Sequence, residues 1–447
     1  MNQGAIAVRF VAAGSSWRVR FVTLFVLGLS VGLLMVRNSQ LSGDQFPMLE
    51  LGWQLAHNHV WVAHGMLTSA GGYSPGGLTG LLTGIQLLLW NDYRSPALFI
   101  LILNAGAFLL LVRTVRPALT EFGQALLLPL IWLSPWHLYF SSHVWDPNYM
   151  FVFAVLHLAT AQRMSRYNEA STTAAHVLIL GLGVQIHTSA ALLCILSVLL
   201  YRAKLIKVNW PGFALGTLLC IASLMPWILA VSHQPELMPG GRGFPLRGLV
   251  YVFPTLRGIL YWLKMSSLSF AGRMEDIDFI PALGAGLDTV LRPLAGMIGM
   301  LAQLSLIASG WLQWRFFRRR LFRLFRSSTW VARSSTASPR RWLRLYLTAF
   351  FWAAVISFAL SPTTIMFWQV LIALPASALA VIMSAEVLAR SRFRQRVHRL
   401  ARVWSVVAVA VLLCQAVASP MYRCGAYRLQ APSAILSDLH VRLECFK

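Results

Sequence analysis

Long runs of apolar residues, separated by short polar segments, recur along the chain. A helix needs about 20 apolar residues to cross roughly 30 Å of hydrocarbon. The pattern predicts an all-α, polytopic helical membrane protein with about eleven transmembrane helices, which begin near Trp17, Ala97, Phe122, Tyr149, Ala174, Ala190, Pro211, Val290, Leu345, Phe367 and Val403. The run from Tyr149 to Ala161 is short, which leaves a tilted or re-entrant path open there.

The basic residues predict how this bundle is oriented. Arg and Lys concentrate in cytoplasmic loops, and most of the 38 basic residues fall inside if the N-terminus is cytoplasmic and the spans alternate. The apolar stretch from Leu78 to Trp90 would reverse this order if it crossed the membrane. We therefore interpret it as an interfacial or re-entrant helix within a large first outer loop, Asn38 to Ser95, although a spanning path stays open.

Composition supports a membrane protein and bears on the partners. With 57% hydrophobic and 12% charged residues and a mean hydropathy of +0.64, the chain has too little polar surface for a soluble domain. The net charge is +24, and the basic residues of the inner loops are expected to contact anionic membrane lipids. No nucleic-acid partner is expected.

The two parts of the chain differ in their content of polar residues on the predicted outer side. Residues 1–285 carry nearly all the polar outer features and are predicted to form the catalytic membrane module, while residues 286–447 supply further spans, basic cytoplasmic loops and an outer tail. The first apolar run lacks a small-residue cleavage site, so we expect a retained span rather than a cleaved signal peptide. In the outer tail, Cys424 and Cys445 are predicted to form a disulfide.

Two isolated acids follow predicted spans on the outer side. Asp44 comes after the first span and Asp146 after a later one. Acidic residues are rare in this chain, with only 14 Asp and Glu among 447 residues, so an acid at each of these two positions is notable. A carboxylate can accept a hydroxyl proton, and cations stabilise charge on a phosphate leaving group. Further outer polar residues that could serve such a site are Tyr73, His143, Asn148, Gln185, His187, Arg242, Arg247 and Arg257.

Structural roles remain open for several of these residues. Asp44 could be a helix cap, and Asp146 before Pro147 could start the next helix. The arginines from Arg242 to Arg273 could anchor an amphipathic loop to lipid head groups. The Gly-rich stretch 71–77 lacks the Walker pattern and a following Lys, so nucleotide binding is not expected.

Three stretches resemble a known family. They are Gly43-Asp44-Gln45 with the loop onward to Gly77, the blocks Leu133 to Tyr139 and Trp145 to Asn148, and Gly181 to Thr188. Over about residues 20 to 230 the chain resembles bacterial membrane glycosyltransferases of the GT-C superfamily, relatives of the protein mannosyltransferases and the aminoarabinose transferase.

The resemblance implies that Asp44 is the general base and that Asp146 is a second acidic position near acceptor or metal. The family more often has Glu where this chain has Gln45 and Arg where it has His143, so a divalent cation is left open and no other cofactor is expected.

The resulting hypothesis is a glycosyltransferase of the bacterial inner membrane with its active site on the periplasmic or external face. It would move a sugar from a polyprenyl-phosphate donor to a hydroxyl of a glycan, lipid or protein acceptor. His143 and Asp146 would orient acceptor or sugar, while Gln185 and His187 would bind sugar or phosphate. One or more of Arg242, Arg247 and Arg257 would neutralise the phosphate.

Two alternatives remain. One is a lipid-linked oligosaccharide polymerase or ligase, which also relies on outer Arg and His residues. The other is a lipid or solute transporter, which should carry ionisable residues or broken helices near the middle of the membrane in matched halves. The polar residues of this chain gather at one face instead, which favours catalysis.

Overall fold

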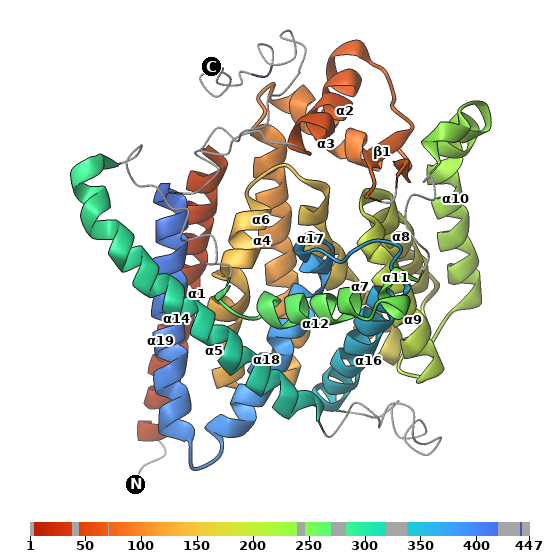
Figure 1. Cartoon of the computed structure of the whole chain (residues 1–447). Coiled ribbons are helices and arrows are strands. Elements are labelled where there is room, and N and C mark those ends of the chain that lie inside the picture. The colour runs from red at the N-terminus through yellow and green to blue at the C-terminus, as the bar shows by residue number, and fades with distance from the viewer. Residues whose placement is uncertain are drawn as a thin grey trace.

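The computed structural model describes residues 4–37, 44–69, 71–238, 246–269, 283–318, 338–418 and 439. Arg242, Cys424 and Cys445 therefore lie outside the described residues, and their predicted roles stay predictions. Long, roughly aligned helices form the body of the molecule (Figure 1).

Seven segments are long and apolar enough to cross a membrane. Six of them are or include the helices α1 (Gly4–Arg37), α4 (Ser95–Val115), α10 (Trp210–His233), α14 (Ala285–Phe317), α16 (Pro339–Leu360) and α19 (Arg394–Ala418). The seventh, Phe367–Ala389, joins α17 (Phe367–Val370), the 3-10 turn η7 (Leu371–Ala373) and α18 (Leu374–Ala389). These helices make the chain a multi-pass membrane protein.

Shorter helices complete the bundle. They are α5 (Glu121–Leu127), which continues into the π-helical turn η2 (Leu128–Trp132), and α6 (Pro135–Ser141), α7 (Met150–Arg166), α8 (Ala170–Ile186) and α9 (Ala191–Arg202). Every one of the eleven predicted spans begins in or within a few residues of one of these helices. The predicted all-α polytopic fold is confirmed.

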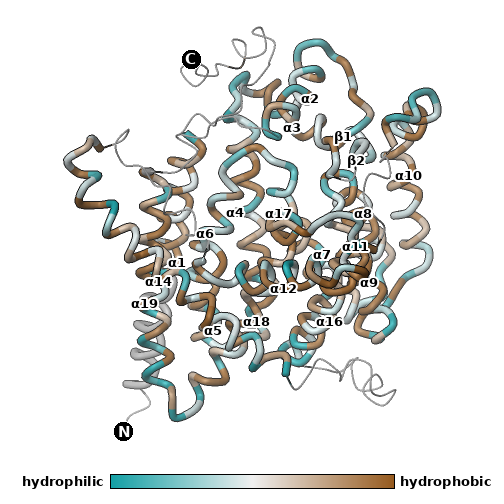
Figure 2. The backbone as a smooth tube through the Cα atoms, viewed as in Figure 1, coloured by the Kyte–Doolittle hydropathy of each residue, from teal (hydrophilic) through white to brown (hydrophobic). Residues whose placement is uncertain are grey.

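Burial separates the centre of the bundle from its lipid-facing edge. In the most apolar 18-residue stretch of the Phe367–Ala389 segment 94% of residues are buried, whereas in that of α10 only 6% are. A helix that is apolar all round but uncovered by protein is expected to face lipid. Figure 2 shows a second division, between the length of the bundle and its ends, because hydrophobic residues dominate the long helices and hydrophilic residues gather at the ends.

Caps explain where two of the helices begin. Asn209 precedes α10 and its side-chain oxygen accepts a hydrogen bond from Gly212 N at 3.0 Å, with Pro211 in the first turn. Thr120 precedes α5 and its hydroxyl accepts a bond from Gly123 N. The Thr120 hydroxyl and N–H also donate to Glu386 of α18, so this cap ties two helices together.

The segment between α1 and α4, which is predicted to be the first outer loop, contains α2 (Gln45–Asn58), α3 (Leu78–Leu89) and the hairpin of β1 (His64–Leu67) and β2 (Tyr73–Pro75). Helices α2 and α3 pack at one end of the bundle (Figure 1). Their backbones touch, because a Cβ on Gly52 would lie 2.9 Å from Gly84 N. With 12 residues, α3 is about 18 Å long, too short to cross the hydrocarbon, which agrees with the interfacial interpretation.

The hairpin is antiparallel and irregular, with His64 opposite Pro75 and Leu67 opposite Tyr73. Gly76 follows β2 with a φ of +84°, and a Cβ there would lie 2.5 Å from the Gln185 side-chain oxygen. Only glycine satisfies both demands. This close approach fixes the hairpin on α8.

Two further helices, α11 (Arg247–Val250) and α12 (Phe253–Met265), follow α10, and α12 runs across the long helices (Figure 1). Trp262 of α12 donates a hydrogen bond to the side-chain oxygen of Gln313 in α14. The Gln313 amide donates to Ser266 at 2.7 Å and to Ser377 of α18 at 3.1 Å. These buried bonds hold α12 against α14 and α18.

Candidate active site

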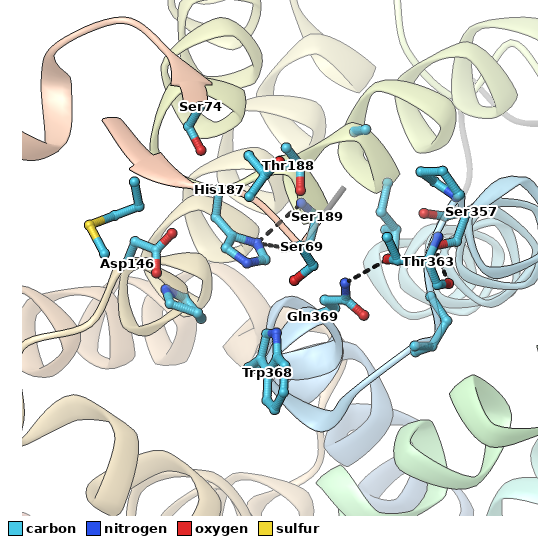
Figure 3. Close-up of a pocket in the computed structure, with 18 of the residues that line it drawn as sticks. Ser69, Ser74, Asp146, His187, Thr188, Ser189, Ser357, Thr363, Trp368 and Gln369 are labelled. Atoms are coloured by element: carbon cyan, nitrogen blue, oxygen red, sulfur yellow. Dashed lines mark hydrogen bonds between the residues drawn. The ribbon is translucent and has the colours of Figure 1, made fainter. Parts of the chain in front are cut away.

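A cavity of about 510 Å³ lies at the level of the hairpin. Its walls come from the start of α2, the hairpin, the turns before α7 and after α8, and the segment Ser357 to Gln369 (Figure 3). The polar residues that line it are Asp44, Thr68, Ser69, Ser74, Asp146, His187, Thr188, Ser189, Ser357, Ser361, Thr363 and Gln369. The structure thus brings the two isolated acids to one cavity.

Asp44 is exposed and lies directly before α2. Its backbone is already helical, with φ −70° and ψ −12°, and its side chain makes no capping hydrogen bond. A capping aspartate normally has extended backbone and accepts a bond from the first turn. The capping interpretation therefore fails for Asp44, and its carboxylate lines the cavity instead.

Asp146 is buried, with 7% of its surface exposed, in the 3-10 turn η3 (Asp146–Tyr149). Pro147 follows it in the first turn, as the sequence suggested. Burial, and then repulsion from the Asp44 carboxylate, raise the pKa of Asp146 to about 8. At neutral pH the Asp146 carboxyl is therefore mostly protonated and can donate a hydrogen bond.

His187 follows α8 and lies on the cavity wall with its ring turned inward (Figure 3). Ser189 N donates to its Nδ1 at 3.2 Å, so this nitrogen carries no proton and Nε2 carries it. Burial lowers the pKa of His187 to about 4, which keeps the ring neutral. The Nε2–H group is thus available as a hydrogen-bond donor to a ligand.

The opposite wall is formed by the segment that links α16 to α17. Gln369 accepts a hydrogen bond from Met366 N at 2.8 Å and donates to the Thr363 hydroxyl at 3.5 Å. Trp368 lies 5.6 Å from Trp145 between ring centroids, and both rings line the cavity. Hydroxyls and an amide beside two half-buried tryptophans suit a ligand with both polar edges and apolar faces.

His143 and Asn148 lie behind this wall rather than on it. His143 Nδ1 donates to the Tyr139 carbonyl at 2.8 Å, and its ring stacks on Trp145 at 6.2 Å. Burial lowers the pKa of His143 to about 4. The Asn148 amide donates to the His143 carbonyl at 2.8 Å. Both residues hold the turn that presents Trp145 and Asp146, and neither is part of the cavity lining.

Gln185 and Tyr73 also support the cavity from outside its lining. The Gln185 amide donates to the Ser223 hydroxyl of α10 at 2.8 Å, and the side chain lies against Gly76. The Tyr73 ring packs on His64 across the hairpin at 4.1 Å. Of the predicted pair after α8, only His187 reaches the cavity.

The two described arginines of the predicted phosphate group do not line the cavity either. Arg247 is exposed and lies over the Tyr251 ring at 5.8 Å. Arg257 donates to the Tyr261 hydroxyl at 3.2 Å. Within the described ranges, no Arg or Lys is part of the cavity lining. The interpretation of these two residues as anchors of an amphipathic segment fits their positions better.

The cavity offers two carboxylates as possible ligands of a divalent cation. In the part of the chain that the structure describes, no group of three His, Cys, Asp or Glu residues could hold a metal ion. Two carboxylates do share the cavity, and Mg²⁺ is often bound by one or two carboxylates together with substrate phosphates. Asp44 and Asp146 would hold such an ion, and the cation stays a prediction.

Sequence reasoning missed the wall from Ser357 to Gln369, because this region was interpreted as plain spans. A signal was present in the polar break Ser361-Pro362-Thr363-Thr364 between two apolar runs, followed by Trp368 and Gln369. The break lies on the same side as Asp44 and Asp146 in the predicted topology. The cavity therefore draws on both predicted modules, and the boundary at residue 285 remains a prediction.

Comparisons with known proteins give two structural matches. No family model matches the chain, and no curated protein matches it. ArnT from Cupriavidus metallidurans in the apo state is 14% identical over 97% of this chain and 78% of that one, with a TM-score of 0.48. The same protein bound to undecaprenyl phosphate is 14% identical over 95% and 77%, with a TM-score of 0.46. ArnT is an aminoarabinose transferase of the GT-C family.

Proposed function

We propose that this protein is a membrane glycosyltransferase that moves a sugar from a polyprenyl-phosphate donor to an acceptor hydroxyl. The observation that carries the proposal is the meeting of Asp44 and Asp146 in one cavity with His187. The cavity lies at the end of the bundle that the basic residues predict to be external. Nucleotide sugars are not available there, so a lipid-linked donor fits.

The carboxyl groups of Asp44 and Asp146 have different roles in this scheme, because one is exposed and the other is buried. Asp44 is exposed and accepts the proton of the acceptor hydroxyl as its oxygen attacks the anomeric carbon. The bond from that carbon to the phosphate oxygen breaks, and the polyprenyl phosphate leaves with the electron pair, with inversion at the carbon. Asp146, protonated at neutral pH, donates a hydrogen bond that orients the sugar or acceptor.

The remaining lining residues bind and orient. The His187 Nε2–H donates to a sugar or phosphate oxygen, while Trp145 and Trp368 offer apolar ring faces to the sugar. Arg242 would stabilise the charge on the leaving phosphate. A divalent cation held by Asp44 and by the ionised form of Asp146 would supply the same stabilisation, and Asp146 would then be a ligand rather than a hydrogen-bond donor. Arg247 and Arg257 anchor the surrounding segment in this scheme.

The test compares the native protein with two variants. A deletion strain and its parent are compared by mass spectrometry of their glycolipids, which identifies the missing sugar. The purified protein, Asp44→Asn and Glu50→Gln are then assayed for transfer of that sugar from its polyprenyl phosphate. Glu50 lies on the same helix outside the cavity lining and is the matched control.

Loss of transfer in Asp44→Asn alone supports the proposal. A protein that moves the intact lipid or a solute across vesicles without transferring the sugar is a transporter. A product that is a polymer of repeat units identifies a polymerase or ligase.

A further inference from the structure

A second, smaller cavity lies where three helices end. It has a volume of about 130 Å³ and is lined by Arg315, Phe316, Arg318 of α14, Arg344 of α16, and Met383 and Val387 of α18 among others. The end of α14 and the start of α16 lie at the opposite end of the bundle from the hairpin (Figure 1). This cavity is thus separate from the candidate active site.

The cavity gathers positive charge without a counter-charge in its lining. Among the described residues, no carboxylate forms an ion pair with Arg315, Arg318 or Arg344. The nearby Glu386 is fully buried and pairs with Arg340 at 2.5 Å, while Thr120 donates two hydrogen bonds to it. Like charges this close repel unless an anion binds between them.

Helix capping explains only part of this cluster. Arg315 lies in the last turn of α14 and Arg318 directly follows it, and a cation at a helix C-terminus is favourable. Arg344 lies near the start of α16, where the helix dipole does not favour a cation. Partial burial and repulsion from Arg340 and Arg390 also disfavour the charge of Arg344, while Glu386 attracts it. The Glu386 carboxylate is already paired with Arg340, so an anion in the cavity would add stabilisation to the cluster.

The helix surface beside the arginines marks the depth of the membrane boundary. Trp311 and Trp314 are 53% and 61% exposed, and they lie one helical turn before Arg315 of α14 and before Arg318, which directly follows α14. Exposed tryptophans are enriched at the interface between hydrocarbon and head groups. The Arg315 guanidinium lies over the Trp311 ring at 5.9 Å, which holds it at this level.

We propose that this cavity binds the phosphate of an anionic phospholipid head group in the adjacent leaflet. A guanidinium group can donate two parallel hydrogen bonds to the oxygens of one phosphate. Phe316, Met383 and Val387 form an apolar wall for the glycerol and the upper part of an acyl chain. Basic pockets between membrane helices on the cytoplasmic side are suited to such head groups. The site does not depend on the proposed transferase activity.

The test measures lipid binding to the purified full-length chain by native mass spectrometry, with phosphatidylglycerol and phosphatidylcholine as probes. The wild type is expected to bind phosphatidylglycerol at least about tenfold more tightly than phosphatidylcholine. The variant Arg315→Gln with Arg344→Gln should lose about tenfold in phosphatidylglycerol affinity per arginine. Arg396→Gln with Arg399→Gln removes the same charge from exposed positions of α19 and should bind as the wild type does.

Equal loss in both double variants would overturn the proposal, because it would show a general charge effect. Equal binding of the two lipids by the wild type would also overturn it. Displacement of the lipid by millimolar inorganic phosphate would show a site for free phosphate and reject the lipid assignment. If the double variant does not fold, Arg318→Gln replaces it, since this exposed side chain contributes little to packing and must still weaken phosphatidylglycerol binding about tenfold.

Discussion

Asp146, in the turn before α7, and Asp44, at the start of α2, line the same cavity, and the Asp44 carboxylate adds to burial in raising the pKa of Asp146 to about 8. One carboxyl group is exposed and the other is buried. Two titratable groups in one site whose surroundings differ in this way are suited to different roles in acid–base chemistry. This relationship leads to the first two predictions.

Replacing Asp44 by Asn should lower sugar transfer by roughly 10²- to 10⁴-fold, because the general base is lost. The unfolding temperature should change little, since the Asp44 side chain makes no capping hydrogen bond. Turnover, donor binding and thermal unfolding are measured on the variant and on Glu50→Gln. Near-parental turnover in Asp44→Asn would show that the carboxylate has no part in catalysis.

The raised pKa of Asp146 predicts a dependence of stability on pH. The ordinary value is 3.8 and the value in the folded chain is about 8, so between these limits the folded chain keeps a proton that the unfolded chain has lost. The free energy of unfolding should therefore fall as the pH rises from about 4 to 8. Asp146→Asn cannot ionise, and its unfolding temperature, recorded across the same pH range, should lack this contribution. Parallel curves for wild type and variant would contradict the buried, protonated state.

The ion pair of Glu386 and Arg340 predicts a strong effect on stability. Arg340→Ala leaves the fully buried Glu386 carboxylate without its cation, which should cost about 3–5 kcal/mol. Replacing both partners by apolar residues, as in Arg340→Met with Glu386→Leu, should restore part of the loss. Thermal unfolding in detergent measures both variants, with Arg396→Ala as the exposed control. A loss in Arg340→Ala no greater than in the control would reject the pair as a structural element.

The topology predicts which surfaces can be labelled in cells. The hairpin that contains Tyr73 and the loop between α18 and α19 lie at opposite ends of the bundle (Figure 1). Cysteines placed at Tyr73 and Arg394 should therefore react from opposite sides, with Tyr73 accessible to an impermeant thiol reagent from outside. Reaction of Arg394→Cys from the outside in intact cells would reverse the predicted orientation and the location of the active site.

The bundle was largely predictable from sequence, because a span must be apolar over a fixed length. The charge pattern favours a path for Leu78 to Trp90 that does not cross the membrane, and the stretch forms the 12-residue helix α3, whose length agrees with this interpretation. The approach of Asp44 to Asp146 was also expected, since both follow spans on the same side. These inferences need only local composition and alternation of sides.

The lining of the cavity was less predictable, because it depends on which helices pack together. Gln185 was chosen for its polarity at a span end, yet it bonds to Ser223 and leaves His187 alone at the cavity. Arg257 is bound to Tyr261 within its own helix. Thr363 lies in a polar break of only four residues between two apolar runs, and Gln369 lies within the second of these runs, so neither stands out in the sequence. Direction of a side chain within the bundle is set by tertiary contacts that periodicity does not show.

The cavity walls come from residues 44–69 and 357–369, far apart in the order of synthesis. A chain that ends before α16 would contain both carboxylates but would lack the cavity wall from Ser357 to Gln369. If the proposed function holds, such a truncated chain should transfer no sugar, and the site would be completed only late in synthesis.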